Sequence, residues 1–570
     1  MSSSSMTTCW TCRLRKKKCD KKKPVCGVCH TLGITCDQST ARPSWLGDDH
    51  ERQKLARQVK IEIKQKAELR RERDYVNVLT LQNATVVEDA APSTATHALV
   101  HTQETLSENA RSSQGTIFPG EPGCDSEGSP DGMELELQIT YLDQVFPFFF
   151  PFYHPSIVDG GRTWVLASLR GSTPLSHTAM SLSTYFIALV LGHKDDDQQG
   201  DCARTMWDKL ASHLDAAIKA MQQAMGDLNV DESGSSISQW TCLMEGVVQL
   251  LVFGTGMAKT TDGHIHIAAA ASLFRQIIDV YGTKDATPDL QLVLGIMNKP
   301  SLGFVASDYR TWNNEQCAFR FFVAVLLFVD IIASTVLGNT PQLYSYHPFL
   351  IHDGTGLQAS EGLLRMEDFV GCPGWVLLLI ADSTAVGAQR QRRELGHFEI
   401  VGKCTSISKR LETGMAELRA DSNGVGAPND LLLPHFNLAP GPAERNRHSL
   451  IWAHAVQLYH FITASGWCEQ HQSVRANVSI ILSLLRQVSS VAVLRNLSWP
   501  FCVAGCLATQ DEENAFREIA DIMGELRSFG TTSEALKIME QIWKMRGQID
   551  LATWNFARCF SIFGSFPLLV

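Results

Sequence analysis

The sequence predicts a small helical, cysteine-rich unit at the N-terminus, a disordered linker, and a large all-α body. Three observations support this prediction. Six of the 16 cysteines stand in the first forty residues. Residues 80–131 are rich in Ser, Thr, Ala, Gly and Pro and lack apolar periodicity, and most of the remaining chain carries amphipathic helical patterns. We expect the first unit at residues 1–46, a charged helix at 47–79, the linker at 80–132 and the body at 133–570.

The N-terminal cysteines form a twofold repeat with the spacing C-x2-C-x6-C-x6-C-x2-C-x6-C. They are Cys9, Cys12, Cys19, Cys26, Cys29 and Cys36, and each of the last three follows its counterpart by 17 positions. A C-x2-C pair brings two sulfurs within reach of one zinc ion, at a Zn–S distance of roughly 2.3 Å. Each half offers three thiolates, one fewer than a closed zinc site needs. If Cys9 and Cys26 bridge, two zinc ions each gain four sulfurs from these six residues.

The two halves differ between their second and third cysteines. The first half has five cations among the six residues from Arg13 to Lys18, whereas the corresponding residues His30 to Thr35 contain no Lys or Arg. Metal binding does not explain this difference. Binding in a groove of DNA does explain it, because guanidinium and ammonium groups bind phosphates and guanine edges. We therefore expect a short helix that begins at Cys12 and carries the cationic row into duplex DNA, with the second half as scaffold.

These residues resemble the fungal binuclear zinc cluster (C6-type) DNA-binding domain. The resemblance rests on the cysteine spacing, the run R-L-R-K-K-K-C-D from Arg13, and Lys23-Pro24 before Cys26. It implies that the cluster helix reads CGG-type triplets through the third and fourth positions after the second cysteine, which are Arg15 and Lys16. It also implies that Pro24 is the loop proline that joins the halves.

The other basic residues of this unit would contact phosphates or fix the orientation on DNA, because phosphate contacts position a protein without reading sequence. They are Arg13, Lys17, Lys18, Lys21 and Lys22.

Two simpler interpretations of the N-terminal unit are a disulfide framework and a nuclear localisation patch. A disulfide framework needs an apolar secretory signal, but four of the eight residues from Met1 to Thr8 are serine. The basic run is also typical of a nuclear localisation patch, and we expect it to serve both purposes.

Charge is unevenly distributed along the chain. Residues 1–74 contain 18 Lys and Arg against 9 Asp and Glu, which leaves 32 against 51 for the rest. Such a division is typical of a nucleic-acid-binding arm on an acidic body. The other ten cysteines are scattered without metal-binding spacing, as expected for buried thiols in a reducing compartment.

Residues 51–74 predict a polar helix, because they contain no Gly or Pro and carry 9 basic against 5 acidic side chains. A possible dimer seam is weak, since only four of its seven positions are apolar. Its positions are Leu55, Val59, Glu62, Lys66, Leu69, Arg73 and Val76. Both interpretations stay open: a dimerisation helix, or a solvated helix that contacts phosphates.

Periodic apolar residues predict several helices in the body. The clearest stripe is Leu210, Leu214, Ile218, Met221 and Met225, and further helices are expected at 451–462, 474–485, 514–526 and 533–545. The most apolar stretch, Phe321 to Leu337, is interrupted by Asp330. We take it to be too short to span a membrane and interpret it as a buried core helix.

The body also resembles a known family, the fungal-specific transcription factor domain, over most of residues 133–570. The matching motifs include Y-L-D-Q-V-F-P-F-F-F-P-F-Y from Tyr141, G-G-R-T-W from Gly160, V-D-I-I-A-S from Val329 and W-P-F-C-V-A-G-C-L-A from Trp499. The resemblance implies an all-α regulatory region of the kind paired with an N-terminal zinc cluster.

No catalytic motif stands out in the body: it has no G-x-S-x-G elbow, phosphate-binding loop or H-E-x-x-H. We therefore expect no enzyme and no catalytic residues. The chain is interpreted as a nuclear, sequence-specific regulator of RNA polymerase II genes, of a metabolic or biosynthetic set. Its expected partners are double-stranded DNA and the transcription machinery or coregulators, without a membrane, while homodimerisation stays open.

Two rival functions remain at this stage. One is a zinc-cluster regulator that acts only through protein contacts, and the other is an enzyme with an unrecognised site. A small-molecule effector cannot be identified from these residues.

Overall fold

The computed structural model divides the chain into two compact units, Met1–Thr94 and Ala95–Val570, each with its own buried core. The described residues of the first unit are 8–15, 17–23, 25–32, 34–38, 52, 55 and 59. Those of the second unit are 130–156, 159–191, 212–213, 215–220, 222–223, 237–257, 263–284, 287–297, 312–354, 364–421, 440–551, 553–564 and 566–570.

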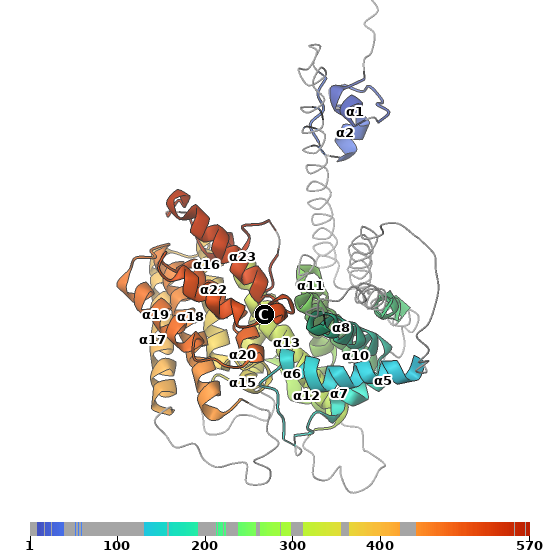
Figure 1. Ribbon diagram of the computed structural model, residues 1–570, viewed down its shortest axis with the longest axis vertical. Helices are drawn as coiled ribbons and strands as arrows, with labels where there is room; N and C mark the ends of the chain where they lie inside the picture. The colour runs from blue at the N-terminus through green and yellow to red at the C-terminus, as the bar shows by residue number, and fades with distance from the viewer. Residues whose placement is uncertain are drawn as a thin grey trace, which may run out of the picture. The chain divides into compact units, whose positions relative to one another are not determined.

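The described residues between 8 and 38 form two short helices, α1 (Trp10–Leu14) and α2 (Gly27–Leu32), drawn in blue in Figure 1. Each helix directly follows the first cysteine of one half of the repeat. The buried apolar cluster that joins them consists of four cysteines and Ile34. Aliphatic packing therefore contributes little to the core formed by the described residues of this unit.

The second unit is helical, as the sequence predicts. Its first half contains α5 (Pro130–Thr140), the π-helix η2 (Tyr141–Val145), α6 (Phe146–Phe149), α7 (Thr163–Gly171), α8 (Thr173–Leu191), α10 (Ile237–Gly256), α11 (Gly263–Tyr281), β1 (Thr283–Lys284), β2 (Thr287–Pro288) and α12 (Leu290–Met297).

The second half continues with α13 (Asn314–Leu337), the 3-10 helix η4 (Tyr344–Tyr346), α14 (His347–Leu350), α15 (Met366–Phe369), α16 (Gly374–Gln391), α17 (His397–Asp421), α18 (Pro442–Ser465), α19 (Gln472–Leu485), α20 (Val491–Arg495), α21 (Ser498–Cys506), α22 (Glu513–Asp521), η5 (Gly524–Ser528), α23 (Thr532–Met545), η6 (Arg546–Gln548) and α24 (Phe556–Phe560). Within the described residues, the antiparallel pair of β1 and β2 is the only sheet.

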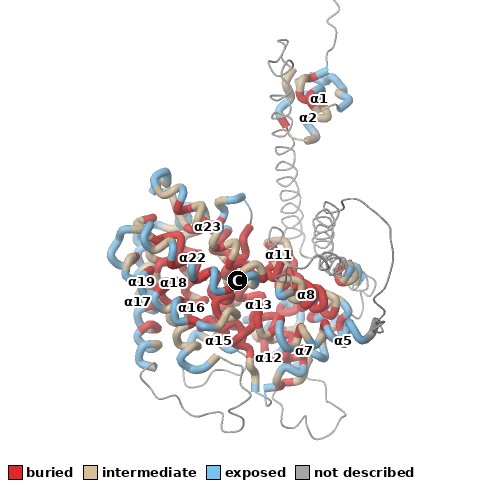
Figure 2. The backbone as a smooth tube through the Cα atoms, viewed as in Figure 1, coloured by how far each residue is buried: buried red, intermediate tan, exposed pale blue. Residues whose placement is uncertain are grey.

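The core of the second unit is built around α13, which packs against α7, α10, α16 and α24 and lies among the buried, red segments of Figure 2. Twenty of its 24 residues are buried. The helix begins at a capping box formed by Asn313 and Gln316, which satisfies free backbone N–H groups. It ends at Gly338, whose φ of 64° is left-handed and suits glycine.

Asp330, the acidic residue within the apolar run of α13, binds the backbone of the segment that follows this helix. Its carboxylate accepts hydrogen bonds from the backbone N–H groups of Gln342 and Leu343, at 3.0 and 2.8 Å. Burial raises the pKa of Asp330 to about 6, although these two hydrogen bonds oppose the shift.

The expected core helix at 321–337 is confirmed as part of α13, but the argument from its length is wrong. Among the described residues, α10 and α13 are long and apolar enough to cross a membrane. Their apolar windows are 72% and 89% buried inside the protein, as in the core helices of soluble proteins. The burial of α13, rather than a short length, marks it as a core helix.

Most of the other predicted helices are found within α18, α19 and α23. The helix expected at 514–526 ends earlier, because α22 stops at Asp521 and η5 follows at Gly524, where φ is 54°. In the stripe at 210–225, Ile218 is helical and completely buried, whereas Leu210, Leu214, Met221 and Met225 lie outside the described residues.

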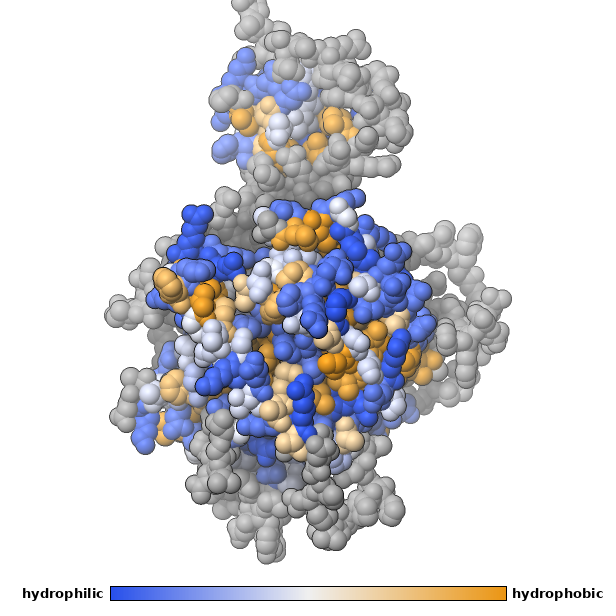
Figure 3. All heavy atoms as spheres, turned by 90° about the vertical axis from the view of Figure 1, so that its left-hand side faces the viewer, coloured by the Kyte–Doolittle hydropathy of each residue, from blue (hydrophilic) through white to orange (hydrophobic). Residues whose placement is uncertain are grey.

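The aromatic run that begins at Phe146 lies in the core rather than on the surface. The ring of Phe321, in α13, has its centroid 5.4 Å from that of Phe146, 4.7 Å from that of Phe150 and 4.9 Å from that of Trp164. On the face of this unit shown in Figure 3, hydrophilic and hydrophobic residues are interspersed.

Candidate zinc centre and nucleic-acid interface

The twofold repeat in sequence is repeated in local structure. Cys9 precedes α1, and its sulfur accepts a hydrogen bond from the backbone N–H of Cys12 at 3.3 Å. Cys26 precedes α2, and its sulfur accepts one from the N–H of Cys29 at 3.4 Å. A C-x2-C pair wrapped around the first turn of a helix thus brings two sulfurs to the same side, as the spacing predicts.

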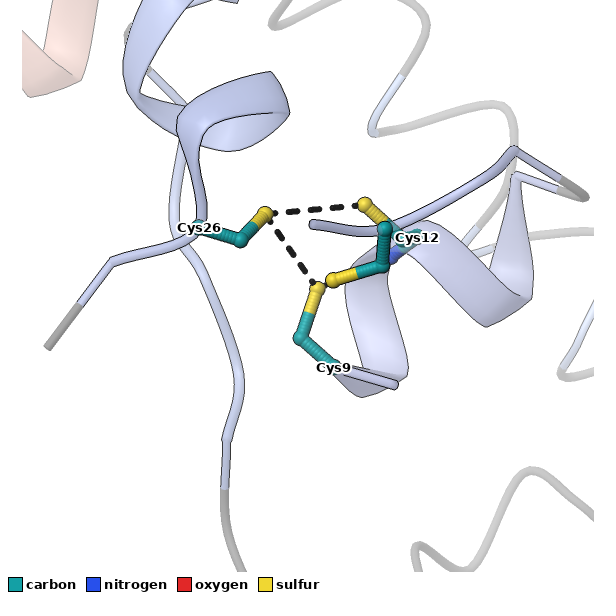
Figure 4. A group of neighbouring side chains, drawn as sticks. Cys9, Cys12 and Cys26 are labelled. Carbon is teal, nitrogen blue, oxygen red and sulfur yellow. Dashed lines mark hydrogen bonds between the residues drawn. The ribbon is translucent and has the colours of Figure 1, made fainter. Parts of the chain in front are cut away.

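The four sulfurs of these two pairs meet across the unit. Cys26 Sγ lies 3.7 Å from Cys9 Sγ and 3.7 Å from Cys12 Sγ, and Figure 4 shows these three side chains pointing toward one another. Cys29 Sγ lies 3.9 Å from both Cys9 Sγ and Cys12 Sγ. A tetrahedron with Zn–S bonds of roughly 2.3 Å has S–S edges of about 3.8 Å. The Cys9–Cys26, Cys12–Cys26 and Cys9–Cys29 distances therefore fit the edges of tetrahedral zinc sites.

The six sulfurs form two overlapping groups of four. One contains Cys9, Cys12, Cys19 and Cys26, the other contains Cys9, Cys26, Cys29 and Cys36, and the sulfurs within each group lie within 4.8 Å of one another. Both groups contain Cys9 and Cys26, the two residues that the cysteine count predicts as bridges.

The protonation of these thiols depends on their surroundings. Burial raises the pKa of Cys9, Cys12 and Cys29. At Cys19 and Cys36 burial acts in the same direction, but hydrogen bonds to the sulfurs outweigh it and lower the pKa. Buried thiolates need a positive charge among them, and a zinc ion supplies that charge and deprotonates coordinating thiols.

Hydrogen bonds outside the sulfur groups hold the two halves together. The Asp20 carboxylate accepts from the N–H of Gly27 at 2.9 and 3.0 Å, and a Cβ at Gly27 would approach Asp20 Oδ2 to 2.5 Å. The Thr11 hydroxyl donates to the Thr35 carbonyl and accepts from the N–H of Asp37. These roles were not predicted from the sequence, although an acid directly after Cys19 and a glycine directly after Cys26 are a recognisable signal.

The cationic row lies mostly beyond the helix, which corrects one prediction. α1 begins at Trp10, two residues before the expected Cys12, and ends at Leu14. Its early start follows from capping by Cys9, and its early end allows the chain to return to the sulfurs at Cys19. The helix therefore carries Arg13, while Lys17 and Lys18 stand on irregular backbone after it.

The basic side chains are mostly exposed. Arg13, Lys17, Lys18, Lys21 and Lys22 are all exposed, and Arg15 is half-buried. The guanidinium of Arg13 stacks 5.2 Å from the ring centroid of Trp10, which fixes its direction.

Lys16 and Pro24 lie outside the described residues, as do five of the seven positions of the possible dimer seam: Glu62, Lys66, Leu69, Arg73 and Val76. The two described seam positions, Leu55 and Val59, are helical and half-buried, and Val59 packs against the apolar cluster of the zinc-binding unit. One apolar position of the weak seam thus packs within its own chain.

Comparison with known families identifies both units. The profile of the fungal Zn(2)-Cys(6) binuclear cluster domain matches residues 7–45, and the profile of the fungal-specific transcription factor domain matches residues 136–560. The chain belongs to this family of fungal transcription factors. Zn(2)-Cys(6) domains bind two zinc ions and DNA, so zinc is the cofactor of this transcription factor, which is not an enzyme.

The fungal transcription factor has relatives along nearly its whole length. It is 32% identical to the transcription factor dibT of Pestalotiopsis microspora, over 99% of this chain and 98% of that one. It is 26% identical to the pestheic acid cluster transcriptional regulator 3 of Pestalotiopsis fici, over 96% of both chains. It is 24% identical to the trichothecene biosynthesis transcription regulator TRI10 of Trichoderma arundinaceum, over 72% of this chain and 92% of that one. No solved structure matches the chain. The names of these relatives imply a nuclear protein.

Proposed function

We propose that the protein is a sequence-specific regulator of RNA polymerase II genes that belong to a biosynthetic gene cluster, and that it reads CGG-type DNA triplets. The observation that carries this proposal is the pair of sulfur groups that share Cys9 and Cys26. The exposed cationic residues lie beside them, in the first half of the cysteine repeat. Relatives named for pestheic acid and trichothecene biosynthesis support the assignment to a biosynthetic cluster.

In this proposal the ligands of the two zinc ions are Cys9, Cys12, Cys19, Cys26, Cys29 and Cys36. Two zinc ions and six thiolates leave a net charge of about −2. The backbone N–H groups of Cys12 and Cys29, and that of Lys21 at 3.4 Å from Cys19 Sγ, point at sulfurs and offset this charge. The chemistry that zinc supplies is structural: it fixes the orientation of α1 and of the chain that follows it.

The division of labour among the cations follows from their position. Arg15 and Lys16 would read base edges, because they are the third and fourth residues after Cys12, the positions that read bases in the zinc cluster domains this unit resembles. Arg13, Lys17, Lys18, Lys21 and Lys22 would contact phosphates, since all five are exposed and phosphate contacts do not depend on the base sequence. Residues 1–46 would form the reader, 47–79 the connecting helix, 80–132 the linker and 133–570 the regulatory body.

The experiment is selection of bound sequences from a random duplex pool by the zinc-loaded full chain, with the Cys9→Ala variant as control. The expected result is enrichment of CGG-type triplets by the native chain and none by the variant. The spacing of paired triplets would report whether the chain binds as a homodimer. A native chain that holds two zinc ions but enriches no sequence would overturn the proposal and favour a regulator that acts through protein contacts.

A further inference from the structure

The helix α5, drawn in cyan in Figure 1, carries large apolar side chains on two opposite faces. Leu137 on α5 and Tyr141, where η2 continues the helix, are one turn apart and buried, and α5 packs against α8. Leu135 and Ile139 are also one turn apart, but they are 50% and 48% exposed. Because a shift of two residues turns a helix by about 200°, this second pair points away from the body.

The buried face is the one that joins this helix to the body. The Tyr141 hydroxyl accepts a hydrogen bond from the side chain of Gln249 on α10 at 3.0 Å. The core formed by the described residues contains Tyr141 but neither Leu135 nor Ile139. Packing of the body therefore does not explain why both positions of the outer face are apolar.

The surroundings of the outer face are acidic. Glu136 stands three residues before Ile139 and Asp143 stands four residues after it, so both carboxylates are its neighbours on the helix surface. Both are exposed, and none of the ion pairs formed by the described residues includes them. Between Arg111 and Arg162 the sequence contains eight Asp and Glu but no Lys or Arg.

This charge decides which partners the outer face can take. In a symmetric dimer the same patch of both copies forms the interface, so the carboxylates of the two chains would repel one another. DNA is excluded for a similar reason, because its backbone is negative. An apolar groove with Lys or Arg at its rim is complementary to this face, since such a groove accepts apolar side chains four residues apart on a helix.

We propose that the outer face, formed by Leu135, Glu136, Ile139 and Asp143, docks a protein of the transcription machinery whose apolar groove is rimmed by Lys or Arg, and that this contact activates transcription. The run M-E-L-E-L-Q-I from Met133 alternates apolar with acidic or amide residues, and such alternation is typical of activating segments. The inference rests on the proposed function, because a regulator bound at its genes acts by recruiting the machinery that transcribes them.

The test is a reporter assay in a fungal cell, with the full chain fused to the DNA-binding domain of a bacterial repressor whose operator precedes the reporter gene. This tether removes the need for triplet reading, so failure of the DNA selection and failure of this inference are separate results. The native fusion should raise reporter transcription. Leu135→Ser with Ile139→Ser should reduce this increase about tenfold, as the loss of a central interface contact does. Glu136→Lys with Asp143→Lys should reduce it similarly, through repulsion of the basic rim.

Matched controls lie on α17, at side chains that are also exposed. Phe398→Ser, at a side chain that is 89% exposed, and Glu412→Lys with Glu417→Lys should leave the reporter unchanged. Chromatin immunoprecipitation should show equal operator occupancy for every variant, and circular dichroism an unchanged Tm. If the serine pair lowers the Tm, the charge-reversal pair decides, because it keeps both apolar side chains. Full reporter activity in both α5 variants, or no increase with the native fusion at full occupancy, would overturn the proposal.

Photo-crosslinking tests the chemistry of the partner. A photoreactive amino acid in place of Ile139 in the full chain should form an adduct with a protein of the transcription machinery, at a surface that combines apolar residues with Lys or Arg. The same amino acid in place of Phe398 is the control and should not form this adduct. An adduct with a second copy of the chain alone would make the outer face a dimer interface and contradict the proposal, as would an adduct surface without Lys or Arg.

Discussion

The two units of this protein reach a stable fold by different means. Among its described residues, the zinc-binding unit buries four cysteines and Ile34 as its apolar cluster. The body buries aromatic and aliphatic side chains around α13, from Phe146 near its start to Leu569 near its end. A short segment cannot obtain enough free energy from its own core, so metal coordination must supply it, whereas a body of this length needs no metal. Loss of zinc should therefore destabilise the first unit alone, and a cavity in the apolar core should destabilise the body alone.

Substitution of a zinc ligand should have the largest effect on the stability of the first unit. Because Cys9 belongs to both sulfur groups, Cys9→Ala should lose both zinc ions, whereas Cys19→Ala, which belongs to one group, should retain one. Structural zinc contributes on the order of 10 kcal/mol to folding, so Cys9→Ala should unfold the first unit and leave the Tm of the body unchanged. Native mass spectrometry gives the zinc count. Cys242→Ala, at an exposed cysteine of the body, is the matched control and should retain two ions. Equal zinc loss in the Cys9 and Cys19 variants would contradict the shared arrangement.

A substitution that leaves a cavity in the core of the body should destabilise the body and leave zinc binding unchanged. Phe321 packs against Phe146, Phe150 and Trp164, and Phe→Ala substitutions in a core cost about 3–5 kcal/mol. Phe321→Ala should lower the denaturant midpoint of the body while the chain still binds two zinc ions. Phe398→Ala, at a side chain that is 89% exposed, should change neither property. Loss of zinc from the Phe321 variant would mean that the stabilities of the two units are coupled.

Between about pH 4 and 6, the stability of the body and the zinc affinity of the first unit should change in opposite directions. Asp330 has a folded pKa of about 6, above its ordinary 3.8, so between these values the folded state binds more protons than the unfolded state. Asp330 therefore makes the body less stable as pH rises from about 4 to 6, by up to about 3 kcal/mol. Zinc binding strengthens over the same range, because its thiol ligands must lose protons. Chemical denaturation of the native chain and of Asp330→Asn across this range isolates the contribution of Asp330. Identical slopes would show that the pKa of this carboxyl is the same in the folded and unfolded states.

Sequence patterns predicted the parts of the protein that depend on spacing and periodicity. The shared positions of Cys9 and Cys26 follow from counting sulfurs, and α18, α19 and α23 follow from their apolar stripes. The end of α1 at Leu14 could not be predicted, because it depends on where the chain must turn to bring Cys19 back to the other sulfurs. The burial of Arg495 could not be predicted either, since its neighbours Phe149 and Gly530 come from distant parts of the chain.

The smallest expected effects separate two kinds of cation within the zinc-binding unit. Arg15 is half-buried at the end of α1, so Arg15→Ala should relax the preference for the selected triplet by about 1–3 kcal/mol. Lys22 is exposed on irregular backbone, so Lys22→Ala should weaken binding to all sequences alike and reduce the slope of log Kd against log salt by about 1. Titrations of selected and scrambled duplexes at several salt concentrations measure both quantities. Because neither residue is a zinc ligand in this assignment, both variants should keep two ions per chain. An equal loss of affinity for both duplexes in the Arg15 variant would remove Arg15 from base reading and move that role to other residues of the unit.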